Sequence, residues 1–164
     1  MDDKRLFISI LVENEFGSLS RIAGLFSARG YNIHCLNVAP TNDESISRMT
    51  LVTFCNDQKI KQLAKQLDKL IDVVKVKDLT GNNLIDRELL LIKLEVNTKN
   101  KSHLDKTNCS ILSEEKSLYV AEFIGTSSEV DKVILSLQNC PLLEVVRTGV
   151  SAISSDELIF SVKN

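Results

Sequence analysis

Hydrophobic and polar positions follow two different periods along the first eighty residues, and these periods predict strands and helices in a regular order. Stretches rich in Ile, Leu, Val, Thr and Phe predict strands, the first of them with so little alternation that burial on both faces is expected. These stretches are Lys4–Glu13, Ile33–Ala39, Ser47–Cys55 and Asp72–Leu79. Four strands are therefore expected in this part of the chain.

Between these stretches, apolar residues recur at helical spacing, which predicts two amphipathic helices. The first carries Leu19, Ile22, Ala23 and Phe26, and the second carries Ile60, Leu63, Leu67 and Leu70. Gly30 is placed to end the first helix, and Asn56 or Asp57 can cap the second. The order β-α-β-β-α-β predicts an α+β, ferredoxin-like domain over residues 1–79, with one antiparallel sheet and both helices on one face.

The same order begins again after a polar linker at residues 80–86. Strands are predicted at Arg87–Val96, Cys109–Leu112, Leu118–Gly125 and Leu143–Val146. Thr126-x-x-Glu129 is a capping-box pattern that opens a helix, whereas Asn97–Thr107 is polar and only weakly helical. The tail from Ser151 has a less regular pattern. We therefore expect a second, degenerate ferredoxin-like domain over residues 87–164.

Composition restricts the function but does not assign one. Hydrophobic residues make up 43% of the chain and charged residues 26%, with a net charge of −2 and no basic stripe to attract nucleic acid. The apolar runs are too short to cross a bilayer, and the N-terminus lacks a signal-peptide pattern, so a cytoplasmic location is expected. The four cysteines form no C-x-x-C pair, and no metal-ligand or catalytic motif is present. A binding module is favoured over an enzyme.

The candidate chemistry lies in the turn from Asn14 to Arg21. A helix that starts directly after a tight turn offers free backbone N–H groups to an anion, and Gly17 lets a ligand approach the backbone. The expected guest is a carboxylate, since no phosphate-binding glycine motif occurs. Gly17 could instead only permit the turn, and Ser18 only cap the helix. Asn32 could bind a polar group or only adopt a left-handed conformation, and Arg48 could meet a carboxylate or solvent.

Several segments, in order along the chain, resemble the small regulatory subunit of acetohydroxyacid synthase, also called acetolactate synthase. In the first half they are Glu13–Arg21, Gly24–Ile33, Val38–Thr41, Ser47–Thr50 and Lys65–Val73. In the second half they are Arg87–Leu89, Ser117–Tyr119, Gly125–Ser127 and Arg147–Val150. The match spans most of the chain in order, and as a set the segments are highly specific, although single pieces such as Gly-Tyr-Asn-Ile are not.

The resemblance implies that the first domain is an ACT domain, paired side by side in a homodimer with amino-acid effectors held between the two copies. Asn14, Gly17 and Asn32 match the family's effector-binding positions, and their neighbours Ser18, Leu19 and Ile33 complete the expected site. The family stimulates a large catalytic subunit and transmits feedback inhibition, usually by valine. Thiamine diphosphate, magnesium and FAD are then expected only in that catalytic partner, with no catalytic residue and no metal in this chain.

The sequence departs from the family pattern in two places. Phe16 is bulky where a small residue or proline is common, and Asn97–Lys116 is shorter than usual and lacks a clear amphipathic helix. The resulting hypothesis is a non-catalytic regulatory subunit in valine, leucine and isoleucine biosynthesis. The alternatives are an ACT-domain sensor of a different enzyme, a small enzyme, or an RNA-binding module, for which Ser47–Cys55 lacks the aromatic pattern.

Overall fold

The structure, a computed structural model, describes residues 3–81, 83–155 and 160. It divides into two compact units, of which the second is Asp86–Gly149. The first unit comprises the residues up to Ile85 together with the described residues from Val150 onward. Asn82 of the predicted linker and most of the tail after Ser155 lie outside the described residues.

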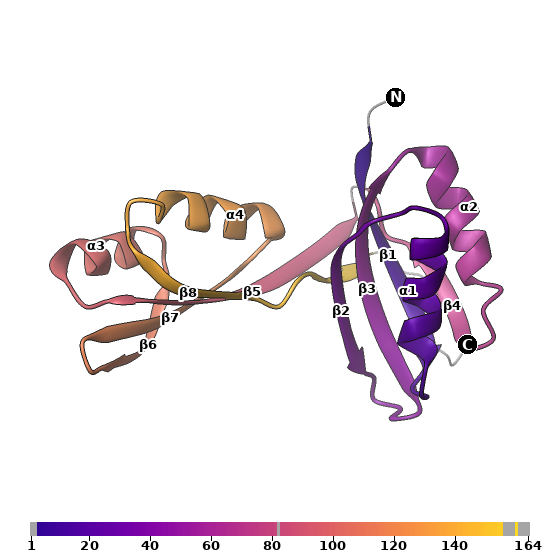
Figure 1. The fold of residues 1–164 in the computed structure, drawn as a ribbon, viewed down its shortest axis with the longest axis horizontal. Coiled ribbons are helices and arrows are strands. Elements are labelled where there is room, and N and C mark those ends of the chain that lie inside the picture. Colours follow the sequence, from indigo (N-terminus) through magenta and orange to yellow (C-terminus); the bar gives the residue numbers. More distant parts are fainter. Residues whose placement is uncertain (1–2, 82, 156–159, 161–164) are drawn as a thin grey trace. The chain divides into compact units, whose positions relative to one another are not determined.

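The first unit has the predicted order of elements. They are β1 (Lys4–Glu13), α1 (Ser18–Ala28), β2 (Ile33–Pro40), β3 (Ile46–Cys55), α2 (Asp57–Leu67) and β4 (Val73–Asp78). The four strands form an antiparallel sheet in the order β2-β3-β1-β4, in which Ile10 pairs with Met49 on one side and Val76 on the other. Both helices cover one face of this sheet (Figure 1). The predicted α+β, ferredoxin-like plan is confirmed.

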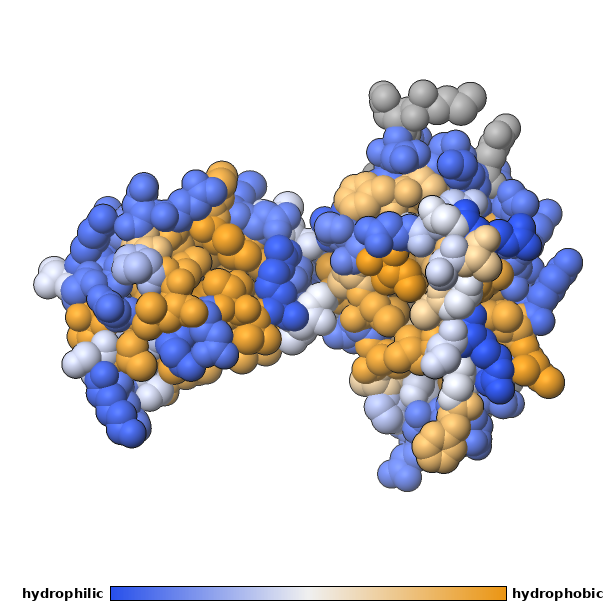
Figure 2. Space-filling view, in the orientation of Figure 1, coloured by the Kyte–Doolittle hydropathy of each residue, from blue (hydrophilic) through white to orange (hydrophobic). Residues whose placement is uncertain are grey.

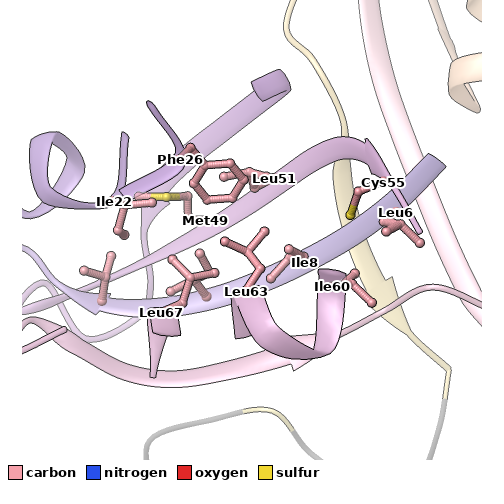
Figure 3. Close-up of a cluster of buried hydrophobic side chains, with 12 residues drawn as sticks. Leu6, Ile8, Ile22, Phe26, Met49, Leu51, Cys55, Ile60, Leu63 and Leu67 are labelled. Atoms are coloured by element: carbon pink, nitrogen blue, oxygen red, sulfur yellow. The ribbon is translucent and has the colours of Figure 1, made fainter. Parts of the chain in front are cut away.

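The core of this unit lies between the sheet and its two helices. Ile22 and Phe26 of α1 meet Leu63 and Leu67 of α2 over the strands, and all four are at most 1% exposed (Figure 3). Burial of such a side chain is worth about 1.5–3 kcal/mol, so this cluster fixes how α1 lies on the sheet. It thereby positions both ends of α1.

The opposite face of the same sheet is also covered, by the strand β9 (Ser151–Ser154) that follows the second unit. Val150 and Ala152 pack with Val52 and Leu79 in a separate apolar cluster. The Ala152 N–H donates to Thr50 Oγ1 at 3.3 Å, and the Val150 N–H donates to the Cys35 thiol at 3.0 Å. A strand with apolar residues on both faces needs cover on both, and the tail supplies the second cover.

This tail differs from the sequence expectation, which placed all of residues 87–164 in the second domain and described the tail from Ser151 as less regular. The predicted domain boundaries were drawn from the repeated order of strands and helices. The compact units instead reflect which residues pack together. Strand β9 pairs with β5 (Leu84–Glu95), and the Ser155 N–H donates to the carbonyl of Asn83 at 2.8 Å. The first unit is therefore built from two separate stretches of chain.

The second unit repeats the topology of the first. After β5 come α3 (Thr98–Lys106), β6 (Ser110–Glu115), β7 (Leu118–Gly125), α4 (Ser127–Ser136) and β8 (Leu142–Arg147). The strands are ordered β6-β7-β5-β8, which matches the order in the first sheet position by position. Tyr119, Val130 and Leu137 belong to its core, and the capping box at Thr126 and Glu129 is formed as predicted.

The helix α3 lies in a segment whose pattern predicted a helix only weakly. The Asn97 side chain caps it by accepting from the Asn100 N–H at 2.7 Å, and Asn100 in turn donates to the carbonyl of Glu95 at 2.7 Å. Asn100 is 1% exposed and Leu104 is fully buried. Because its inward face uses a satisfied polar residue beside one leucine, the helix shows little apolar periodicity. None of the helices in the described part of the chain could cross a membrane.

Candidate functional site

The turn between β1 and α1 has the backbone geometry of a ligand-binding helix start. Gly17 is the N-cap residue with φ of +89°, a left-handed conformation that favours glycine. The first intrahelical bond runs from the Arg21 N–H to the Gly17 carbonyl at 2.9 Å. The N–H groups of Leu19 and Ser20 therefore have no acceptor within the helix, and no side chain caps them.

Ser18 does not cap the helix, as one interpretation of the sequence had it, but is its first residue. It is 4% exposed, and its hydroxyl has no hydrogen-bond partner among the described residues. A buried hydroxyl without a partner is unfavourable, because its hydrogen bonds to water are lost without replacement. The first turn of α1 thus contains an unused donor and acceptor beside its free N–H groups.

Asn14 follows β1 directly and joins this turn to the loop between β2 and β3. Its side-chain nitrogen donates to the Glu44 carbonyl at 3.0 Å, and its side-chain oxygen accepts from the Ser47 hydroxyl at 3.1 Å. An amide can make four hydrogen bonds, so one donor and one acceptor site remain. Asn14 is exposed and held in place, and it can still offer both kinds of bond to a ligand.

Arg21 is a further charged residue at this turn that the sequence reasoning did not select. A Cβ atom built on Gly17 would lie 3.5 Å from Nη1 of Arg21, so the guanidinium group borders the glycine. Nη1 also forms an ion pair with Asp72, whose side chain is 11% exposed whereas that of Arg21 is 50% exposed. Side chains on a helix lean toward its N-terminus, so the four-residue spacing from Gly17 was the available signal.

The other two predicted site residues lie at the opposite end of α1. Asn32 and Ile33 follow the helix stop at Gly30, whose φ is +68°. The helix has 11 residues, which places the two ends about 16 Å apart. Asn32 has no positive φ, contrary to one interpretation, and its carbonyl accepts from the Thr53 hydroxyl at 2.7 Å. Within one chain, Asn14, Gly17, Ser18 and Leu19 are brought together, whereas Asn32 and Ile33 are not brought to them.

Arg48 is not a solvated arginine at the sheet edge, and it is not at the turn. It lies on the sheet face under β9, where it donates to the Ser9 hydroxyl at 3.1 Å and to the Ala152 carbonyl at 3.3 Å. Burial lowers the pKa of Arg48. Its donors bind the tail, so it supports the fold of the first unit.

The second unit contains a buried ion pair between Glu88 and Arg147. The Glu88 carboxylate, with its side chain 2% exposed, accepts from Nε of Arg147 at 2.6 Å, from Nη2 at 3.0 Å, and from the Ser127 hydroxyl at 2.9 Å. The hydrogen bonds to Glu88 raise the pKa of Arg147. This network joins β5, β8 and the start of α4. In the described part of the chain no three His, Cys, Asp or Glu side chains are grouped as metal ligands.

The fold and the turn define a class: an ACT-type domain with an open helix start, followed by a second domain of related topology. Residues 8–75 match the family described as the AHAS small subunit-like ACT domain, and residues 87–156 match the small subunit of acetolactate synthase. The chain belongs to the family of acetolactate synthase small subunits, the regulatory subunits in branched-chain amino-acid biosynthesis.

Similar proteins extend this match over nearly the whole chain. The small subunit of acetolactate synthase isozyme 3 from Escherichia coli K12 is 38% identical over 160 residues, which covers 94% of this chain and 98% of that protein. A probable small subunit from Methanothermobacter thermautotrophicus is 35% identical over 159 residues, or 94% and 95% of the two chains. The crystal structure of the small subunit from Thermotoga maritima aligns with a TM-score of 0.85 at 28% identity, covering 94% and 99%.

Proposed function

We propose that this chain binds a branched-chain amino acid, with valine as the leading candidate, and thereby controls a large catalytic subunit of acetolactate synthase. The observation that carries the proposal is the uncapped start of α1, where Gly17 has a positive φ and the buried Ser18 hydroxyl has no partner. A carboxylate would accept from the free N–H groups of Leu19 and Ser20 and gain from the helix dipole.

The remaining parts of a zwitterionic effector need an acceptor and an apolar surface. The ammonium group would be held by the free acceptor site of Asn14 and by the chain near Asn32, and the branched side chain would lie against Leu19 and Ile33. Asn32 and Ile33 of the same copy are about 16 Å away across the 11 residues of α1, so these contacts would come from a second copy. The proposed ligand therefore lies between two ACT domains.

The form of the first sheet supports pairing of this kind. Strand β2, which begins with Ile33, is at the edge of the sheet, where β3 is its one neighbouring strand among the described residues. A homodimer through this domain would cover such an edge. Effector binding can then change activity only by favouring one of two arrangements of the complex over the other.

Exposed apolar side chains on the second unit support association with a catalytic subunit. Large apolar side chains remain exposed there, and Figure 2 shows apolar patches bordered by polar residues. The exposed apolar side chains of this unit include Leu112, Ile124, Leu135, Leu143 and Val146, each between 48% and 62% exposed. Exposed apolar surface of this kind is suited to a protein partner. Thiamine diphosphate, magnesium and FAD would be carried by that partner.

The test is reconstitution with a purified acetolactate synthase large subunit. We expect the chain to bind the large subunit and raise its activity, and one of valine, leucine or isoleucine to lower the activity of the complex. Calorimetric titration of the chain alone identifies which amino acid binds. Activation without any response to the three amino acids would leave the partner in place and reject the effector site.

A further inference from the structure

We infer that Arg21 is a carboxylate-binding residue of the effector site and that Asp72 holds its guanidinium group in position until the effector arrives. The inference rests on the proposed function, because it concerns the same site, but it adds a residue and a chemical requirement. The ligand needs a free carboxylate for tight binding, so amines and amides with the same side chain should bind much more weakly.

The guanidinium group borders the space that Gly17 leaves empty. A Cβ atom on Gly17 would lie 3.5 Å from Nη1, 3.7 Å from Cζ and 3.7 Å from Nη2 of Arg21. All three distances are ordinary van der Waals contacts, so the three atoms form one wall of this space. A ligand that approaches the Gly17 backbone must therefore meet the guanidinium group.

Most of the hydrogen-bonding capacity of Arg21 is unused. A guanidinium group has five N–H donors, and among the residues that the structure describes its only side-chain partner is Asp72, through Nη1. Half of the side chain is exposed, so a ligand can reach the other donors. Asp72 is less exposed than Arg21, and its backbone carbonyl accepts from the Glu13 N–H at 2.8 Å.

A carboxylate at this place would receive two kinds of donor at once. The N–H groups of Leu19 and Ser20 would bind it from the helix start, and the guanidinium group would bind it from the side. Guanidinium and carboxylate groups match in planar, two-bond geometry, and such charge-assisted bonds are stronger than neutral ones. The Asp72 carboxylate binds Arg21 through Nη1, so it orients the guanidinium group and leaves the remaining donors to the effector.

A purely structural ion pair makes a different prediction. If Arg21 and Asp72 only tied α1 to the segment before β4, loss of either partner would disturb the turn in the same way. If Arg21 binds the effector, Arg21→Met weakens binding, whereas Asp72→Asn frees the guanidinium group and keeps or strengthens binding. The two variants therefore separate the two roles by the direction of their effects.

The experiment is calorimetric titration of the full-length protein with L-valine and with L-valinamide. The wild type is expected to bind L-valine and to bind the amide at least tenfold more weakly. Arg21→Met should lose about ten- to hundredfold in affinity for L-valine, the equivalent of one charge-assisted bond. Its preference for L-valine over the amide should also shrink, because only the backbone N–H groups then remain for the carboxylate. Asp72→Asn should bind L-valine as tightly as the wild type or more tightly.

Two further variants keep the result interpretable. Arg29→Met removes an exposed arginine just after the last residue of α1 and should leave binding unchanged. Arg21→Gln can keep a hydrogen bond to Asp72 without the charge, so it replaces Arg21→Met if that variant does not fold. Unchanged L-valine binding by a folded Arg21 variant, or equal losses in the Arg21 and Asp72 variants, would overturn the inference. Absence of binding by the wild type to any branched-chain amino acid would instead reject the proposed function.

Discussion

Substitution of Gly17 by Asp tests the proposed site most directly, and the structure defines what the new side chain meets. The residue has φ of +89°, so any side chain there costs about 1–2 kcal/mol of backbone strain, with Asp among the better tolerated residues. Its Cβ would be 3.5 Å from Nη1 of Arg21, which is not a clash. The new carboxylate would lie against the guanidinium group, in the place proposed for the effector carboxylate.

The expected loss of effector affinity follows from this position. One charge-assisted hydrogen bond is worth about 1.5–3 kcal/mol, and repulsion between the two carboxylates adds to its loss. At about 1.4 kcal/mol for each factor of ten, binding should weaken about ten- to hundredfold or more. Activation of the catalytic subunit should survive, because its contacts need not involve the Gly17 turn.

The assay combines three measurements on Gly17→Asp and a matched Gly17→Ala variant. Circular dichroism and thermal unfolding report the backbone strain, which both variants share. Calorimetric titration with L-valine and inhibition of the reconstituted complex report binding, which should fall further in the Asp variant. A folded Gly17→Asp protein that is still inhibited at the wild-type valine concentration would refute the site. Equal losses in the two variants would refute the part assigned to charge.

Three other predictions concern the whole chain and the second unit. The purified chain alone should show no acetolactate synthase turnover and no heat of thiamine diphosphate binding, and turnover comparable to the reconstituted complex would contradict this. Light scattering at micromolar concentration should give at least a dimer, and a monomer with and without L-valine would contradict pairing of the first domain. Glu88→Gln should lower the free energy of unfolding by about 1–2 kcal/mol, because it weakens the charge-assisted hydrogen bonds from Arg147, which keeps its ion pair with Asp131. In urea unfolding, Glu144→Gln, which removes an exposed ion pair with Lys93, serves as the control and should change little.

The sequence predicted most of the first unit because its two periodicities are strong there. The apolar stripes of α1 and α2 and the turn at Gly30 are local features, and each was placed within a few residues. The second unit was harder, since α3 rests on Leu104 and on the hydrogen-bonded Asn100 rather than on an apolar stripe. The tail was missed for another reason: its partners, including Thr50, lie about a hundred residues away, and no local pattern records them.

The site residues also differ in whether local sequence could predict their role. Gly17 could be predicted to permit a tight turn, because a glycine just before a helical pattern is a local signal. Ser18 could not be recognised as a buried helical residue, because its surroundings depend on packing. Arg21 is held by Asp72, which lies 51 residues further along the chain, so no spacing rule connects them. The arrangement of a ligand between two copies remains a prediction.

Because β9 packs on the face of the first sheet, the second unit is an insertion within the first unit. It is not a domain added to the end of the first unit. Deleting everything after residue 79 would remove Val150 and Ala152 and expose Val52, which is fully buried in the intact chain. Such a fragment would tend to aggregate through the newly exposed sheet face. Excision of Asp86–Gly149 with a short join between Ile85 and Val150 would keep both covers of the sheet, and it is the natural way to obtain the first unit by itself.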